Sequence, residues 1–173
     1  ILESQKVEAN AQFGKFIDKN YEDWFDSRYE SPEMSHTLFK NKIAPQLSKN
    51  QPTLLVVIDN LRYDQFKVFE PIINNYYKKE SESAFFSILP TATQYARNAI
   101  FSGLTPLDMQ KKYPDWWKND TDEGGKNLFE DKFLGSQIKR LGLDIKWEYH
   151  KINSLRQGKQ LSQNFKSQKA NDL

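Results

Sequence analysis

The sequence predicts an α/β fold, in which a mostly parallel sheet is flanked by helices and preceded by a helical linker. A continuous apolar run at residues 53–59, TLLVVID, is typical of a buried parallel strand. Two further stretches, SAFFSILP at 83–90 and LDIKWEY at 143–149, predict a second and a third strand. Because segments with helical spacing separate the three stretches, the strands are expected to be neighbours in one sheet.

Helical periodicity fills the intervals between these predicted strands. Residues 62–79 carry apolar side chains at helical spacing, and Pro71 is expected to kink or restart that helix. Residues 92–103 predict a helix that stops at Gly103, and residues 128–142 predict another helix that also ends at a glycine.

Residues 1–50 have a different character and predict a helical linker or docking region. Aromatic and aliphatic side chains within residues 13–25 recur at intervals of three and four, as on one face of a helix. A second helix is expected to begin after Ser31, whose side chain can cap it. Pro45 and the polar run that follows mark a boundary, so residues 51–173 are predicted to form the α/β domain.

Composition excludes several classes of protein. The chain has 173 residues, 38% of them hydrophobic, and its 12 Phe, 8 Tyr and 4 Trp supply enough apolar mass for a core. The net charge of +2 gives no reason to expect nucleic acid or an acidic membrane surface as partner. No apolar run approaches the ~20 residues of a membrane span, and no secretory signal opens the chain. Without cysteine, disulfides and thiolate metal sites are excluded, and we expect a cytoplasmic protein.

Polar residues follow two of the predicted strands. Asp59 and Asn60 come directly after the first strand, and Thr91 and Thr93 stand where the second strand turns into a helix. Ligand sites in such sheets lie beyond the carboxyl ends of the strands, so both groups are expected at one sheet edge. A helix N-terminus favours phosphate, and a hydroxyl there can be activated by a metal that a carboxylate holds. Spacing alone leaves an alternative open, because Asp and Thr at such positions are common helix caps.

Two other polar features favour structural roles. The histidines, His36 and His150, are isolated and lack the spacing of metal ligands. The acidic stretch at residues 119–125, NDTDEGG, lacks the terminal glutamate of a calcium-binding loop, so we expect a solvated loop.

Aromatic and charged pairs also have structural explanations. Trp116 and Trp117 could stack on a base, but such a pair more often packs a loop onto its domain. Arg62 and Asp64 are expected to pair with each other or with the backbone.

Several stretches resemble one family. VVIDNLRYDQF at 56–66 resembles the Asp-x-Leu-Arg-x-Asp strand-end motif of PglZ-type domains in the alkaline phosphatase superfamily. LPTATQYARNAIFSGLTP at 89–106 resembles the nucleophile segment of that superfamily, whose frame Thr93 and Gly103 fit and Thr91 does not. YEDWFDS, SPEMSHTLFKNKIAPQL, and YPDWWKND with EGGKN are similar to PorX-type response regulators of the type IX secretion system.

This resemblance implies a domain organisation. Residues 1–50 would be the linker of such a regulator, and residues 51–173 would be the first half of its PglZ-type effector domain. Both ends of the chain also read as the interior of a longer protein. Because the resemblance places the remaining metal ligands beyond residue 173, we do not expect residues 1–173 alone to be active.

The resemblance also implies a zinc-dependent phosphodiesterase that acts on nucleotides or oligonucleotides, as the output of a two-component regulator of type IX secretion. Asp59 would bind zinc, and Thr93 would be the zinc-bound nucleophile. Arg97 or Asn98 would contact phosphate, although the asparagine found three residues after the family's nucleophile is Ala96 here. The complete domain would hold two zinc ions, with the remaining Asp and His ligands outside this chain.

Two other hypotheses compete with this enzyme. The first is a non-catalytic signalling module that binds a partner protein, and the helical linker favours it because such linkers relay dimerisation. A homodimer and a signalling partner are therefore candidate interactions. The second is a small-molecule phosphatase or phosphomutase of the same superfamily. Retention of both Asp59 and Thr93 favours an enzyme over the non-catalytic module.

Overall fold

A computed structural model describes residues 1–165 and 171–173, and the chain divides into two compact units, Ile1–Glu33 and Met34–Leu173. In the first unit, helix α1 (Leu2–Asn20) is followed by a 3₁₀ turn, η1 (Asp23–Phe25). Aromatic rings recur at helical spacing on this segment and pack on one another, for example Tyr21 on Phe25 with ring centroids 5.1 Å apart. In the described part of the chain, no helix is both long and apolar enough to cross a membrane.

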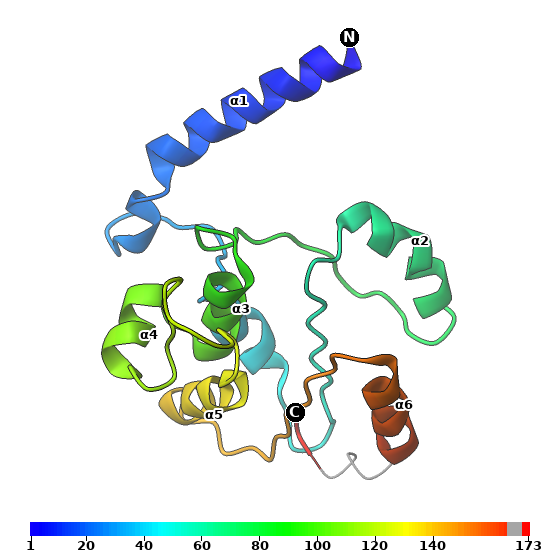
Figure 1. Ribbon diagram of the computed structural model, residues 1–173. Helices are drawn as coiled ribbons and strands as arrows, with labels where there is room; N and C mark the ends of the chain where they lie inside the picture. The colour runs from blue at the N-terminus through cyan, green and yellow to red at the C-terminus, as the bar shows by residue number, and fades with distance from the viewer. Residues whose placement is uncertain (166–170) are drawn as a thin grey trace. The chain divides into compact units, whose positions relative to one another are not determined.

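Helices α3 (Thr93–Ser102), α4 (Pro106–Lys112) and α5 (Glu130–Arg140) form the core of the second unit (Figure 1). α3 ends where Gly103 adopts φ 62°, a left-handed conformation that glycine accepts without a Cβ clash. At this end, the buried amide of Gln137 on α5 donates to the carbonyls of Ile100 and Phe101 at 3.0 and 2.8 Å. The two helices are therefore joined by polar as well as apolar contacts.

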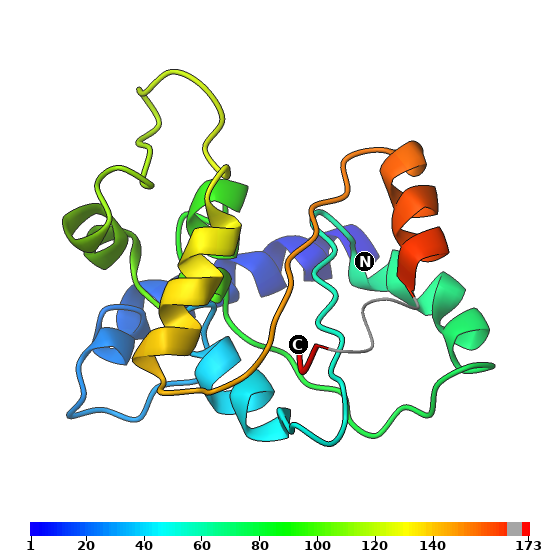
Figure 2. The same cartoon turned by 90° about the horizontal axis from the view of Figure 1, so that it is seen from below.

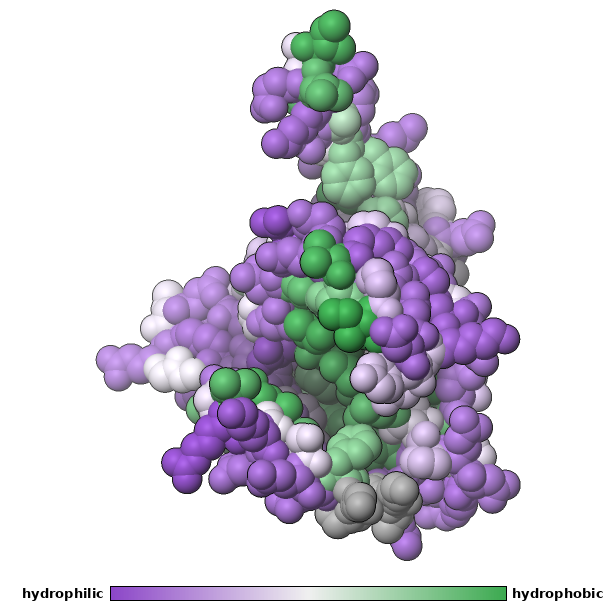
Figure 3. All heavy atoms as spheres, turned by 90° about the vertical axis from the view of Figure 1, so that its right-hand side faces the viewer, coloured by the Kyte–Doolittle hydropathy of each residue, from purple (hydrophilic) through white to green (hydrophobic). Residues whose placement is uncertain are grey.

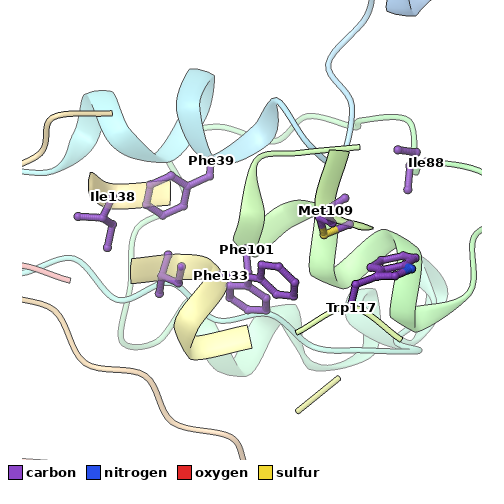
Figure 4. Close-up of a cluster of buried hydrophobic side chains, with 9 residues drawn as sticks. Phe39, Ile88, Phe101, Met109, Trp117, Phe133 and Ile138 are labelled. Atoms are coloured by element: carbon purple, nitrogen blue, oxygen red, sulfur yellow. The ribbon is translucent and has the colours of Figure 1, made fainter. Parts of the chain in front are cut away.

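Figure 4 shows the buried side chains that these helices share. They comprise Phe39, Ile88, Ala99, Phe101, Met109, Trp117, Phe133, Leu134 and Ile138. Phe39 begins a π-helical turn, η2 (Phe39–Ile43), which continues into the 3₁₀ turn η3 (Ala44–Gln46). The second helix expected after Ser31 is thus reduced to these short turns, and its first aromatic residue belongs to the core of the second unit.

The predicted helices at 92–103 and 128–142 are confirmed as α3 and α5. The helix predicted at 62–79 is confirmed in part, because α2 (Tyr63–Ile73) ends at Ile73 and residues 74–79 are not helical. Pro71 lies inside the last turn of α2 and does not restart the helix. Two helices were not predicted, α4 and α6 (Leu155–Asn164). Each carries a local signal, because the Thr105 side chain caps α4 and the Ser154 side chain caps α6 by accepting a backbone N–H three residues on.

The predicted sheet is wrong. Within the described ranges, strand pairing is limited to two isolated bridges, Met34 with Phe86 and Ser48 with Gln51. Apart from the bridge at Phe86, the three apolar stretches form neither helix nor strand and lie beside no continuous partner. Their backbone finds scattered bonds instead, such as Thr53 N–H to the Asp172 carbonyl at 2.9 Å. An apolar run favours extended backbone, but a strand also needs a neighbour in register, and that is a tertiary property.

The first extended segment shows the consequence of this missing pairing. Leu54, Val56 and Ile58 expose 63%, 63% and 56% of their surface, although the sequence predicted a buried strand. In both ribbon views this segment runs between the α3–α4–α5 group and the helices α2 and α6 (Figures 1 and 2). Figure 3 shows apolar surface gathered in a hollow on one face, and a groove of about 620 Å³ is lined by residues 52–57 together with residues 148–153.

Candidate functional site

Asp59 and Thr93 meet at the start of α3. The Thr93 hydroxyl donates to Asp59 Oδ2 at 3.2 Å, and both side chains are exposed. This separation is well inside the ~6 Å that a single metal bonded to both oxygens could span. Although the sheet is absent, the structure brings together the two residues that the strand-end argument paired.

Neither side chain caps a helix. Thr93 is the first residue of α3, whose N-cap is Ala92 and which has no side-chain cap. The N-cap of α2 is Arg62, whose N–H is bound by the Gln65 side chain at 3.1 Å. The capping alternative for Asp59 and Thr93 therefore does not describe this structure. The carboxylate and the hydroxyl are instead exposed and bound to each other.

The turn after Asp59 sets the direction of its side chain. Asn60 has φ 56°, the left-handed region that asparagine tolerates better than most residues. This residue lets the extended segment 53–58 bend sharply before α2 begins. Arg62 and Asp64 lie just beyond the bend and pair with each other at 2.8 Å, as expected from the sequence.

Arg97 completes a trio with Asp59 and Thr93. It lies four residues after Thr93, which places it one turn along the same face of α3. Its Nη1 donates to Asp59 Oδ2 at 3.2 Å, so a single carboxylate oxygen accepts from both the hydroxyl and the guanidinium. The trio combines an acidic oxygen, a hydroxyl and a cation beside a helix N-terminus, whose first N–H groups have no intrahelical partner.

A second carboxylate, Glu130, holds the other side of Arg97. Glu130 is the first residue of α5 and only 1% exposed. Its carboxylate accepts a hydrogen bond from Arg97 Nε, and it accepts from Tyr149 Oη and Lys151 Nζ at 2.8 Å each. Burial raises the pKa of Glu130, but hydrogen bonds from its three partners outweigh burial and hold the pKa below its usual value. Glu130 is therefore ionised at neutral pH.

Sequence reasoning missed this network. Glu130 carries a weak signal, because an acidic residue is favoured in the first turn of a helix, but that signal indicates no partner. Tyr149 and Lys151 lie in the stretch that was predicted as the third strand and just beyond it. Burial and the neighbouring Glu130 charge raise the pKa of Tyr149, so its hydroxyl stays protonated and donates.

Asn98 does not join Asp59 and Thr93. It faces the protein interior with 1% exposure, and its Nδ2 donates to the Lys126 carbonyl at 3.2 Å. The asparagine that reaches the nucleophile region is Asn127, whose Nδ2 donates to the Thr93 carbonyl at 3.2 Å.

The acidic loop at 119–125 closes on itself. The Lys126 ammonium donates to the carbonyls of Asn119, at 2.7 Å, and Asp122, so the loop is stabilised by a cation from the chain itself. Tyr95 on α3 donates to the Asp120 carboxylate at 2.8 Å. These hydrogen bonds hold the loop in place and agree with a structural role for its acidic residues.

The tryptophan pair and His150 contact other parts of the chain. Trp117 is buried, and Trp116 stacks on Tyr113 with ring centroids 4.6 Å apart, so neither tryptophan offers a free platform for a base. His150 Nε2 lies 3.1 Å from Glu148. Among the described residues, there is no group of three or more His, Cys, Asp or Glu side chains that could hold a metal ion. His36 and His150 therefore belong to no such group.

The chemistry of the site fits only part of a metal centre. Asp59 and Thr93 offer hard oxygen donors, but a zinc ion takes about four ligands, and the described residues contain no group of three or more His, Cys, Asp or Glu side chains that could hold one.

Comparison with known protein families gives these residues a context. A family model for the BREX-system PglZ alkaline phosphatase-like domain matches residues 38–171, and a model for the PorX response regulator linker domain matches residues 1–25. The first match places the second unit in the class of alkaline phosphatase-like phosphoesterase domains. The chain belongs to the PglZ family, and a PorX-type response regulator linker precedes its PglZ region. A comparison with curated proteins gave no match.

Proposed function

We propose that the protein is a zinc-dependent phosphodiesterase that acts on nucleotides or oligonucleotides and serves as the effector of a response regulator controlling type IX secretion. The observation that carries this proposal is the Thr93 hydroxyl, exposed at a helix N-terminus and hydrogen-bonded to Asp59 at 3.2 Å. The PglZ family match over both residues supports the phosphoesterase class. The match to a PorX-type linker supports the place in signalling.

Each residue of the trio has a role in this proposal. Asp59 orients the Thr93 hydroxyl by accepting its hydrogen bond, so that Oγ1 attacks phosphorus in line with the ester oxygen that leaves. The bond from phosphorus to that ester oxygen breaks, the hydroxyl proton is transferred to the departing oxygen or to solvent, and water then hydrolyses the phosphoryl ester on Thr93. The free N–H groups of α3 and the Arg97 guanidinium stabilise negative charge on the non-bridging oxygens. Zinc, held by Asp59, Thr93 and ligands outside the described residues, would supply further positive charge beside Oγ1.

Hydrolysis assays test the proposal on the full-length protein. With zinc, it should cleave bis(p-nitrophenyl) phosphate and a short oligonucleotide, and a chelator should abolish both activities. Asp59→Asn should lower kcat/KM and zinc occupancy together, with a loss on the order of 10³-fold in kcat/KM, because the amide cannot match the carboxylate as metal ligand or orienting group.

Asp64→Asn provides a matched control in the same stretch of sequence. Its exposed carboxylate pairs with the exposed Arg62 side chain, so both activity and zinc content should stay near wild type. If wild type cleaves neither substrate, or if Asp59→Asn behaves like Asp64→Asn, the enzymatic proposal is wrong.

A second candidate is a signalling module that binds a partner protein or a second copy of the chain. The observation that favours it is α1, where Leu2, Val7 and Phe13 expose 83%, 61% and 54% of their surface. A protein that hydrolyses nothing, but whose dimerisation or partner binding is lost on Val7→Lys, would favour the module. Preserved binding in that variant would contradict it.

A further inference from the structure

Glu130 is placed to control how Arg97 meets a ligand. Its buried carboxylate binds the Nε side of the guanidinium, while Nη1 of the same group reaches Asp59 beside Thr93. Arginine has five N–H donors in a planar fork, so fixing the Nε edge fixes the direction of the Nη donors as well. The geometry divides Arg97 into a buried side that is held and an open side that faces the candidate site.

Stabilising the fold does not by itself explain this arrangement. α3 and α5 are already joined by Gln137, a neutral side chain whose amide binds two carbonyls of α3. A buried charge costs desolvation energy that a neutral hydrogen bond avoids, so a purely structural tie needs no carboxylate. Glu130 is also at the end of α5 nearest to Arg97 and Asp59, whereas Gln137 binds the far end of α3.

Arg97 is the cation that both carboxylates of the network contact. Glu130 binds Arg97 and Lys151, and Asp59 binds Arg97, so the two carboxylates and the two cations balance in charge. Lys151 is held to Glu130 at 2.8 Å and also donates to the Asn127 carbonyl, and the Asn127 side chain binds the Thr93 carbonyl. Lys151 therefore matches the charge of the buried carboxylate, and Arg97 joins this carboxylate to the Asp59–Thr93 pair.

We propose that Glu130 is a positioning residue, which fixes the Arg97 guanidinium so that its Nη groups bind a non-bridging oxygen of the phosphoryl group attacked by Thr93. This inference rests on the proposed function and assigns the anion-binding side chain of that site. Arg97 then touches the substrate, and Glu130 acts through it. Tyr149 and Lys151 complete the hydrogen bonds of the carboxylate and keep it ionised.

The test uses the zinc-loaded full-length protein and two measurements, the calorimetric Kd for inorganic phosphate and kcat/KM for bis(p-nitrophenyl) phosphate. Glu130→Gln keeps the size of the side chain and removes its charge, and should weaken phosphate binding about tenfold and lower kcat/KM about 10- to 100-fold. Arg97→Ala should lose at least as much. In the double variant, Glu130→Gln should add less than about threefold to the loss caused by Arg97→Ala, because one side chain acts through the other.

Gln137→Met is the matched control, because it removes the other polar tie between α3 and α5. It should lower the unfolding midpoint yet leave phosphate binding and kcat/KM near wild type. If Gln137→Met weakens phosphate binding as much as Glu130→Gln does, or if the Glu130 and Arg97 losses multiply in the double variant, Glu130 is structural only and the inference fails.

Two further experiments test the inference if Glu130→Gln does not fold or if Thr93 is not the nucleophile. If Glu130→Gln does not fold, Arg97→Lys replaces it. Lysine keeps the charge but cannot bind both carboxylates in one plane, and a similar loss of phosphate affinity is expected, whereas unchanged affinity overturns the inference. Calorimetry on Thr93→Ala separates this inference from the proposed function. Phosphate binding that still depends on Glu130 supports the inference even if Thr93 proves not to be the nucleophile.

Discussion

Replacing Thr93 with alanine is expected to lower kcat for phosphodiester hydrolysis by at least ~10³-fold, since removal of a nucleophile leaves only binding and electrostatic effects. The methyl group of alanine keeps the first turn of α3, because the Thr93 side chain makes no helix-capping bond that would be lost. The measurement is kcat with saturating bis(p-nitrophenyl) phosphate on the zinc-loaded full-length protein, together with circular dichroism to verify the helical content.

Thr91 supplies the matched control for this experiment. It is an exposed threonine two residues earlier, before α3 begins, and lies outside the nucleophile frame. Thr91→Ala should retain kcat within about threefold of wild type, and Thr93→Ser, which keeps a hydroxyl, should retain more activity than Thr93→Ala. A Thr93→Ala protein that works within tenfold of wild type would remove Thr93 from the chemistry.

Phe133→Ala is expected to be the most destabilising of the single changes considered, by about 3–5 kcal/mol. Phe133 is 1% exposed on α5, and its ring meets those of Tyr113 and Trp116 edge-on at centroid distances of 5.9 and 5.7 Å. Truncation removes these contacts and leaves a cavity between α5 and the segment after α4. The measurement is chemical unfolding followed by tryptophan fluorescence, which Trp116 reports from beside the cavity.

Leu107→Ala tests whether burial causes this loss. Leu107 lies on α4 with 56% of its surface exposed, so the same kind of truncation should change the free energy of unfolding by less than about 0.5 kcal/mol. Equal losses in the two variants would show that α5 does not pack against the core as described.

The helices α2, α3 and α5 could be predicted because their determinants are local. Apolar spacing, the stop at Gly103 and the glycine after α5 each depend on residues that are close in the sequence, so they can be recognised from the sequence alone. The helices α4 and α6, which were not predicted, each begin after a capping side chain, Thr105 and Ser154, and such a signal is easily missed in a polar stretch.

The prediction of a sheet failed for a physical reason. The run at 53–58 has the β-branched and apolar residues of a buried strand, but it forms no strand in the structure. A strand exists only when a second segment offers donors and acceptors in register along it, and the described residues supply single bonds in place of a ladder. Propensity therefore reflects the residues of this segment and not the neighbours that a strand needs.

The site was predictable in part. The strand-end argument placed Asp59 and Thr93 together but left helix capping open, and the family resemblance gave the pair its roles; the two residues lie in contact. Arg97 was expected as a phosphate contact from the resemblance, and it shares a face of α3 with Thr93. Glu130 could not be found in this way, since the bond from α5 to Arg97 joins residues 33 positions apart and has no local signature.

The most direct test of the proposed chemistry is to look for the covalent adduct on Thr93. The zinc-loaded full-length protein is mixed with excess bis(p-nitrophenyl) phosphate and quenched in acid within the first turnover, and its peptides are then analysed by mass spectrometry. The proposal predicts a phosphoryl-containing adduct on Thr93 that forms in wild type and is absent from Thr93→Ala. An adduct on another residue, or turnover in which Thr93 stays unmodified at every quench time, would contradict it.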